Sequence, residues 1–325
     1  MSETVLRPEP ASPDGVVADA VKGNWVDRLA PPWSRPWLRM SRADRPAGTW
    51  LLYIPCLWGV FLSAAAEGRI GWLGLWIVIG CGIGAFLMRG AGCTWNDITD
   101  RDIDGSVART KSRPIPSGQV TVKGAAVWMC LQALVAFAIL LSFNINAILL
   151  GILSLAPVCV YPFAKRFTWW PQVFLGIAFN WGALLAWTAH QGSLGWPAVC
   201  LYLGGIAWTI FYDTIYAHQD REDDALIGVK STARLFGRHT HAWLGAFGAA
   251  TLVMLLAAVE LALGGAGRPV ALWLARAGAL AMGLHLAWQW RRLDIDNGDL
   301  CLSLFRANRD AGLIFAGFLC VSAAF

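Results

Sequence analysis

Residues 72–104 read WLGLWIVIGCGIGAFLMRGAGCTWNDITDRDID, an apolar run that ends in a cluster of acidic residues. The apolar part, residues 72–95, is long enough for a membrane-spanning helix, which needs about 20 residues. Carboxylates are costly next to hydrocarbon, so an acidic cluster at the end of such a helix indicates a functional site. A second acidic run follows another apolar segment, at residues 213–224.

The composition of the whole chain agrees with this interpretation. Of its 325 residues, 57% are hydrophobic and only 14% are charged, which is too apolar for an ordinary soluble domain. Backbone groups in a bilayer must be paired within the chain, so we predict an all-α membrane bundle. About nine apolar runs qualify as transmembrane helices, of which the last is short: 48–66, 72–95, 124–141, 145–163, 172–190, 195–217, 242–263, 269–288 and 310–325.

The chain also contains an internal repeat. In each half an apolar helix ends in an acidic motif, and a basic turn follows it, Lys111-Ser112-Arg113 in the first half and Lys230-Ser231-Thr232 in the second. This pattern predicts two four-helix repeats around a central cavity, with the ninth helix appended. Residues 1–35 are polar and rich in proline, so we expect a disordered tail before a transmembrane domain at 36–325.

The basic residues predict an orientation. They concentrate in the loops on the side of the N-terminus, whereas the opposite loops carry only Arg69 and Arg268. By the positive-inside rule, the N-terminus and both acidic motifs lie in the cytoplasm. The first thirty residues lack an apolar signal core and contain acidic residues, which argues against a transit peptide. We therefore expect a multi-pass protein of the bacterial inner membrane. The net charge of +5 resides in these loops and does not indicate a nucleic-acid partner.

The acidic residues are spaced for one face of a helix. Asp97, Asp100 and Asp104 recur at intervals of three and four residues, with Asn96 beside them. Like charges at these spacings repel each other, and a bound Mg²⁺ would remove the conflict. The second set behaves in the same way and comprises Asp213, Tyr216, Asp220 and Asp224. We predict as metal ligands the residues Asp97, Asp100, Asp104, Asp220 and Asp224, against the alternative that they are solvated loop residues.

Two metal-binding motifs favour a phosphorylated lipid as the substrate. Mg²⁺ is usually held by one or two protein carboxylates together with phosphate oxygens, so a diphosphate could bridge both motifs. Lys111, Arg113 and Lys230 follow the motifs and are the basic candidates for binding it. Arg89 lies about two helical turns before Asn96, inside an apolar run, and is either a substrate ligand or part of a structural ion pair.

These motifs resemble those of the UbiA superfamily of intramembrane prenyltransferases. The first family motif, NDxxDxxxD, is matched by Asn96, Asp97, Asp100 and Asp104, and the second, DxxxD, by Asp220 and Asp224. The blocks at 109–116, 161–172 and 228–232 are similar to the branch that acts on 4-hydroxybenzoate in ubiquinone biosynthesis. The resemblance implies Mg²⁺-dependent transfer of a polyprenyl group from polyprenyl diphosphate to the ring carbon ortho to the acceptor's hydroxyl.

The resemblance also implies roles for further residues. Arg42 stands just before the first helix, where the family carries a substrate-binding arginine, and it is our candidate for the acceptor's carboxylate. Tyr161 is a candidate aromatic residue of the cavity, and Lys165 serves either substrate binding or membrane orientation. Two alternatives stay open: another acceptor, such as haem, chlorophyllide or a naphthoate, and a transporter that uses the same carboxylates.

Overall fold

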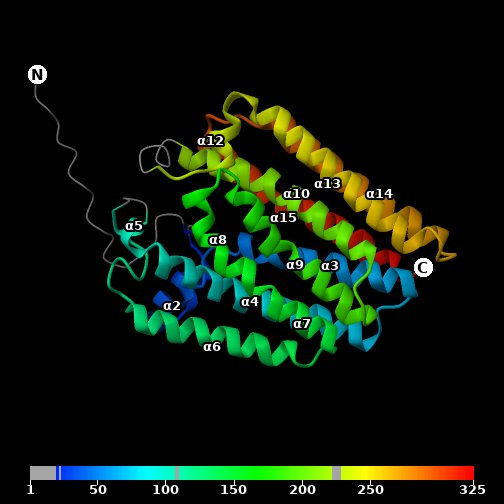
Figure 1. The fold of residues 1–325 in the computed structure, drawn as a ribbon, viewed down its shortest axis with the longest axis horizontal. Helices are drawn as coiled ribbons and strands as arrows, with labels where there is room; N and C mark the ends of the chain where they lie inside the picture. The colour runs from blue at the N-terminus through cyan, green and yellow to red at the C-terminus, as the bar shows by residue number, and fades with distance from the viewer. Residues whose placement is uncertain (1–19, 22, 107–109, 222–227) are drawn as a thin grey trace, which may run out of the picture. The chain divides into compact units, whose positions relative to one another are not determined.

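The computed structural model describes residues 20–21, 23–106, 110–221 and 228–325, and within these ranges it contains helices and turns but no strand (Figure 1). The described helices, in chain order, are α1 Trp25–Leu29, η1 Pro32–Ser34, α2 Arg35–Met40, α3 Ala47–Glu67, α4 Gly71–Thr99, α5 Arg101–Ser106, α6 Val122–Leu140, α7 Ile145–Leu153, α8 Leu155–Phe167, α9 Pro171–Gln191, α10 Trp196–Ala217, η2 His218–Asp220, α12 Thr232–Phe236, η3 Gly237–His239, α13 Thr240–Leu263, α14 Pro269–Arg292 and α15 Gly298–Ser322.

The predicted membrane bundle is confirmed, with a difference in the count. In the described part of the chain, eight helical segments are long and apolar enough to cross a membrane: α3, α4, α6, α7 with α8, α9, α10, α12 with α13, and α14. The predicted ninth segment, 310–325, is the second half of the 25-residue α15. The first half of α15 carries Asp299, Arg306 and Arg309, and these charges lower its hydropathy.

Many of the outward-facing side chains on the spans are large and apolar. On α6, Val127, Leu131 and Leu134 are all more than half exposed, and Leu284 on α14 is 72% exposed. Side chains of this kind gain free energy in hydrocarbon and lose it in water. The surface of these helices therefore matches a lipid bilayer, as the sequence predicts.

The chain packs as two compact units, which differ from the predicted four-helix halves. The first unit comprises residues up to 46 together with 87–134, and the second comprises 47–86 and 135–325. Each of the long helices α4 and α6 therefore has one part in the first unit and the other part in the second. The two acidic motifs fall in different units, the first motif in the first unit and the second motif in the second unit.

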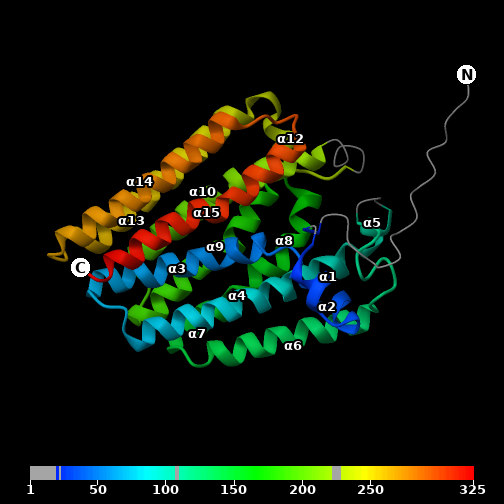
Figure 2. The same ribbon diagram turned by 180° about the vertical axis from the view of Figure 1, so that it is seen from behind.

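Large aromatic side chains fill the core of the second unit. Helix α3 packs against α9 and α15, α10 against α9 and α13, and α14 against α13 and α15. Both ribbon views show α13 and α14 side by side (Figures 1 and 2). At the centre, the ring of Trp58 lies 5.0 Å from that of Trp208 and 5.5 Å from that of Phe315. All three side chains are fully buried.

A chain of polar side chains crosses this core. Trp208 on α10 donates its indole N–H to Asn308 on α15 at 2.8 Å, and Asn308 donates to Gln289 on α14 at 2.8 Å. Gln289 in turn pairs with His285 at 3.1 Å. Polar groups buried without partners would be strongly unfavourable in a membrane, so these hydrogen bonds fix three helices relative to one another.

The first unit begins earlier in the chain than the predicted domain boundary at residue 36. The side chain of Asn24 caps α1 by accepting a hydrogen bond from the Asp27 N–H at 3.0 Å. Residues 25–29 and 32–34 are thus helical, although we predict disorder there. Residues 1–19 of the predicted tail lie outside the described residues.

Helices α4 and α6 approach each other closely within the first unit. A Cβ atom on Gly90 of α4 would collide with Oε1 of Gln132 on α6 and would lie 3.0 Å from Cβ of Ser41. The Ser41 hydroxyl donates to Gln132 at 3.2 Å and accepts from the Trp128 indole at 2.9 Å. A side chain at position 90 would therefore displace Gln132 and crowd Ser41, the neighbour of Arg42.

Candidate active site

The first acidic motif lies where α4 ends and α5 begins. The Asp100 N–H bonds to the Asn96 carbonyl at 2.9 Å, and the Asp104 N–H bonds to the Asp100 carbonyl at 2.8 Å. The helical hydrogen-bonding pattern therefore continues past the bend at Asp100, and the three aspartates keep the predicted register. All three are buried, with Asp97 and Asp100 at most 1% exposed and Asp104 6% exposed.

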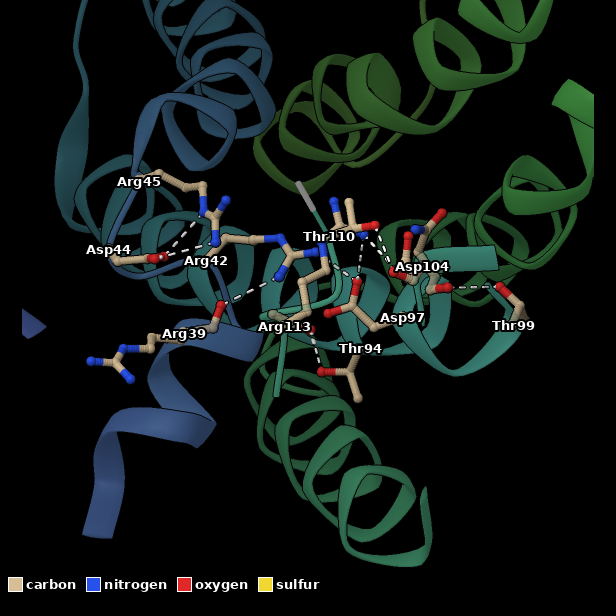
Figure 3. Close-up of polar contacts among 12 residues, drawn as sticks. Arg39, Arg42, Asp44, Arg45, Thr94, Asp97, Thr99, Asp104, Thr110 and Arg113 are labelled. Atoms are coloured by element: carbon tan, nitrogen blue, oxygen red, sulfur yellow. Dashed lines mark hydrogen bonds and ion pairs between the residues drawn. The ribbon is translucent and has the colours of Figure 1, made fainter. Parts of the chain in front are cut away.

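Two arginines bind these carboxylates (Figure 3). Arg42 places Nη2 2.6 Å from Oδ1 of Asp97. Arg113 places Nη1 2.7 Å from Oδ2 of Asp104 and 3.5 Å from Oδ1 of Asp97. Burial disfavours the charge on Arg42, but the combined attraction of its neighbours, chiefly Asp97, exceeds this effect and raises the pKa of Arg42. Repulsion within the acidic stripe is thus compensated by arginines from two other segments, whereas the sequence analysis considered such an ion pair only for Arg89.

Arg42 adopts a backbone conformation that is unusual for its residue type. Its φ of 58° is the only positive value at a non-glycine position among the described residues. The Ala43 N–H bonds to the Leu38 carbonyl and the Arg42 N–H to the Arg39 carbonyl, both at 3.0 Å. This is the Schellman pattern that ends a helix, in which glycine usually occupies the left-handed position. The strain of an L-residue there is roughly 1–2 kcal/mol, and strain of this kind gathers at functional sites.

The motif fits a divalent cation by the chemistry of its oxygens. Oδ2 of Asp97 is buried and has no hydrogen-bond partner among the described residues. No three described His, Cys, Asp or Glu side chains gather into a metal centre by themselves. Mg²⁺ does not require three, because it keeps water ligands and takes phosphate oxygens from its substrate. The assignment of Asp97, Asp100 and Asp104 as ligands stays a prediction.

The remaining predicted residues of the first motif surround it in sequence. Asn96 is half-buried, and its carbonyl accepts from the Thr99 hydroxyl at 2.9 Å. Arg89 is half-buried on α4, and Lys111 is half-buried in the turn after α5. Burial raises the pKa of Asp104, and Arg113 opposes this shift.

The second acidic motif begins near the end of α10. Asp213 is half-buried on this helix, and the ring of Tyr216 lies 4.6 Å from that of Phe305 on α15. Asp220 ends the short helix η2, and Asp224 lies outside the described residues. His218 between them is buried, and burial lowers its pKa to about 4, so it is neutral near pH 7. A neutral His218 bonded to Thr240 at 3.2 Å adds no charge to the motif.

The basic turn of the second half is tied to two helices. The Thr232 N–H donates to Gln172 at the start of α9 at 3.1 Å, and the Thr232 hydroxyl pairs with that of Thr214 on α10 at 2.6 Å. Gln172 therefore bonds the start of α9 to the start of α12. The Lys230 N–H reaches the Lys165 carbonyl at 3.3 Å, so these two predicted residues are neighbours. Tyr161 lies half-buried one turn before Lys165 on α8.

Sequence reasoning missed a charged cluster just before α3. Asp44 is 1% exposed, and Arg45 donates to both of its oxygens at 3.2 Å. Burial raises the pKa of Asp44 to about 6, although the nearby Arg42 opposes the shift. Arg39 binds Asp27 on α1 at 2.7 Å. The signal in the sequence was the dense run of charges at 39–45.

Buried paired aspartates at the end of an apolar helix, in an all-α membrane bundle, define an intramembrane enzyme rather than a soluble one. The model of the UbiA prenyltransferase family matches residues 52–319, so the chain belongs to this family. It is 47% identical over 297 residues to the mitochondrial 4-hydroxybenzoate polyprenyltransferase of Mus musculus, covering 90% of this chain and 76% of the relative. The corresponding protein of Arabidopsis thaliana is 44% identical, covering 97% of this chain and 76% of the relative.

Solved structures agree with the fold. An apo UbiA homologue from Aeropyrum pernix K1 aligns with a TM-score of 0.64 at 25% identity, covering 84% of this chain and 97% of that one. A UbiA homologue from Archaeoglobus fulgidus bound to GPP and Mg²⁺ aligns with a TM-score of 0.59 at 19% identity, covering 89% of this chain and all of that one.

These relatives correct the expected location. The similar enzymes from mouse, Arabidopsis and Homo sapiens are named as mitochondrial, so a bacterial inner membrane is not supported. The physical reason is that loop charge indicates which side of a membrane a segment faces, and it does not distinguish one membrane from another.

Proposed function

We propose that this chain transfers a polyprenyl group from polyprenyl diphosphate to the ring carbon ortho to the hydroxyl of 4-hydroxybenzoate, in ubiquinone biosynthesis. The observation that carries the proposal is the identity of 44–48% to enzymes of that name over about nine tenths of the chain. The reaction breaks the allylic C–O bond, releases diphosphate, forms a C–C bond to the ring, and frees the ring proton.

We propose Mg²⁺ as the cofactor, held by Asp97, Asp100 and Asp104 in the first motif and by Asp220 and Asp224 in the second. The bound cation would stabilise negative charge on the departing diphosphate. Support comes from the buried, unpartnered oxygen of Asp97 and from the Mg²⁺ bound with GPP in the archaeal homologue. We further propose that Asn96 completes the first motif and Asp213 the second.

Basic residues would bind the same diphosphate after each motif. Arg113 contacts two carboxylates of the first motif, which supports a role for its guanidinium in binding phosphate oxygens beside them. Lys111 follows the same motif. In the second half, Lys165 and Lys230 are neighbours, which supports a joint role for them. Arg89 stays a candidate for substrate binding within α4.

The acceptor's carboxylate needs a positive partner in a buried site, because an unpaired charge there would be strongly unfavourable. We propose Arg42 for this role. It is 7% exposed, and Asp97 holds its charge in place. The faces of Tyr161 and Tyr216 are proposed to lie near the developing allylic cation, which aromatic rings attract. Burial would keep water from this cation.

The test is an assay of the purified full chain in detergent with geranyl diphosphate and 4-hydroxybenzoate. We expect a ring-prenylated product and stoichiometric diphosphate, both dependent on Mg²⁺. Turnover only with a naphthoate, haem or chlorophyllide acceptor would exclude the 4-hydroxybenzoate assignment. A transporter would move substrate across a vesicle membrane and release no diphosphate.

A further inference from the structure

The short helix α1 and the residue that follows it contact residues on both sides of Arg42 in the chain. Asp27 of α1 accepts from Arg39 at 2.7 Å through Nη2 and at 3.2 Å through Nε. The Trp25 indole N–H donates to the Ala43 carbonyl at 2.9 Å. The Ala30 carbonyl, just after α1, accepts from Arg35 Nε at 2.9 Å.

Apolar packing reinforces these polar contacts. Val26 and Ala30 pack with Ala43 in a small buried cluster, against which Leu38 also packs. Leu38 is the residue whose carbonyl closes the Schellman motif around Arg42. The contacts of α1 therefore converge on the residues whose backbone hydrogen bonds hold Arg42 at positive φ.

A six-residue helix such as α2 does not persist by its own propensity, since isolated helices shorter than about 12 residues are marginal in water. An L-residue in the left-handed conformation also needs surrounding structure that enforces it. For α2 and Arg42, the described contacts from α1 supply that enforcement. Residues 24–46 precede the stretch 52–319 that matches the family model.

We propose that α1 is a positioning element for the active site: the Asp27–Arg39 ion pair and the Trp25–Ala43 hydrogen bond hold Arg42 in the conformation that reaches Asp97. This inference rests on the proposed role of Arg42 in acceptor binding. Asp27 and Trp25 are positioning residues, and they act on the reaction only through Arg42.

The kinetic test compares Asp27→Asn and Trp25→Phe with Arg42→Ala in the full chain. We expect each positioning variant to raise the apparent KM for 4-hydroxybenzoate about tenfold while the KM for the diphosphate changes little, as in Arg42→Ala. In an Arg42→Ala background, Asp27→Asn should raise the KM for 4-hydroxybenzoate by less than about a further twofold. The guanidinium that the Asp27–Arg39 pair positions is already absent there. Arg28→Gln, an exposed change on the same helix, is the matched control and should leave both KM values unchanged.

A second readout does not depend on activity. Hydrogen exchange at the Ala43 amide, which closes the Schellman motif, should speed up at least tenfold in Asp27→Asn while the amides of α3 stay protected. The exchanged pair Asp27→Arg with Arg39→Asp should restore slow exchange. Additive kinetic effects of Asp27→Asn and Arg42→Ala, or unchanged exchange at Ala43, would overturn the proposal. If the wild type does not prenylate 4-hydroxybenzoate, the proposed function is wrong. Hydrogen exchange at the Ala43 amide still tests the role of α1 in that case.

Discussion

The Arg42 guanidinium donates to the Asp97 carboxylate at 2.6 Å, although Arg42 precedes the first membrane span and Asp97 ends the second. Both side chains are buried, at 9% and 0% exposure. Removing one partner of such a pair leaves the other charge without compensation, which typically costs about 3–5 kcal/mol. The pair therefore links the stability of the first unit to the placement of Arg42, the residue that we propose binds the acceptor's carboxylate.

Arg42→Gly and Arg42→Ala separate the backbone of this residue from its charge. Both changes remove the guanidinium, so we expect the apparent KM for 4-hydroxybenzoate to rise more than tenfold and that for the diphosphate to change much less. Glycine tolerates the positive φ, so Arg42→Gly should unfold at a higher temperature than Arg42→Ala, by about 1 kcal/mol in stability. Equal stability of the two variants in thermal unfolding would contradict the strain at this position.

The acidic motifs are tested by Asp100→Ala and Asp220→Ala. Each variant should lose at least 1000-fold in turnover, because a ligand for the cation that stabilises the leaving group is gone. Fractionation should still find the protein in the membrane. Product formation within tenfold of the wild type in either variant would exclude an essential role for that motif.

Mg²⁺ binding is measurable without turnover. A non-hydrolysable diphosphate analogue with Mg²⁺ should raise the unfolding temperature of the wild type, because ligands that bind the folded state stabilise it. EDTA should abolish the shift, and Asp100→Ala should show little of it. A full shift with the analogue alone would show that arginines and lysines bind the diphosphate without a cation.

Gly90→Ala tests the close approach of α4 and α6. The added methyl group would collide with Gln132 and crowd Ser41, so we expect a loss of about 1–3 kcal/mol in stability. Gly84→Ala on the same helix is the control, because a Cβ there meets nothing within 4 Å. It should be neutral or stabilising, by up to about 1 kcal/mol from helix propensity. Thermal unfolding in detergent compares the two variants.

Asp44 makes stability depend on pH. Its pKa is about 6 in the folded state against an ordinary value of 3.8 for this side chain, so the folded protein binds the proton more tightly. The stabilisation from this proton is complete below pH 3.8 and is lost as the pH rises through about 6. Asp44→Asn should lack this contribution, so the difference in unfolding free energy between it and the wild type should change between these values. A constant difference from pH 4 to 7 would contradict the raised pKa.

The membrane helices and the acidic stripe were predictable because each depends on local sequence. Apolar runs of about 20 residues and aspartates at helical spacing carry their own signal. The sequence predicts only the second half of α15, because the charged residues Arg306, Arg309 and Asp310 interrupt the apolar run. Its charged half is helical because buried residues such as Leu304 and Asn308 pack along it, and hydropathy does not register that packing.

The partners of the aspartates were less predictable. Arg42 and Arg113 reach Asp97 from positions 55 and 16 residues away in sequence, and no local spacing indicates such pairs. Helix α1 has only five residues, and its stability comes from Asn24 and from contacts with α2. Glycine usually occupies the left-handed position that follows a helix, and here Arg42 occupies it. No glycine therefore marks the end of α2 in the sequence.

The hydrogen-bond chain from Trp208 through Asn308 to Gln289 has a consequence for biogenesis. Arg and Asp residues near the middle of a helix each oppose insertion by about 2.5–3.5 kcal/mol, so α15 is a poor candidate for entering the bilayer by itself. Its polar groups find partners on α10 and α14, which the ribosome makes first. The last helix is therefore inserted by docking onto earlier ones, and substitutions at Asn308 should reduce the yield of mature protein before they reduce its catalytic rate.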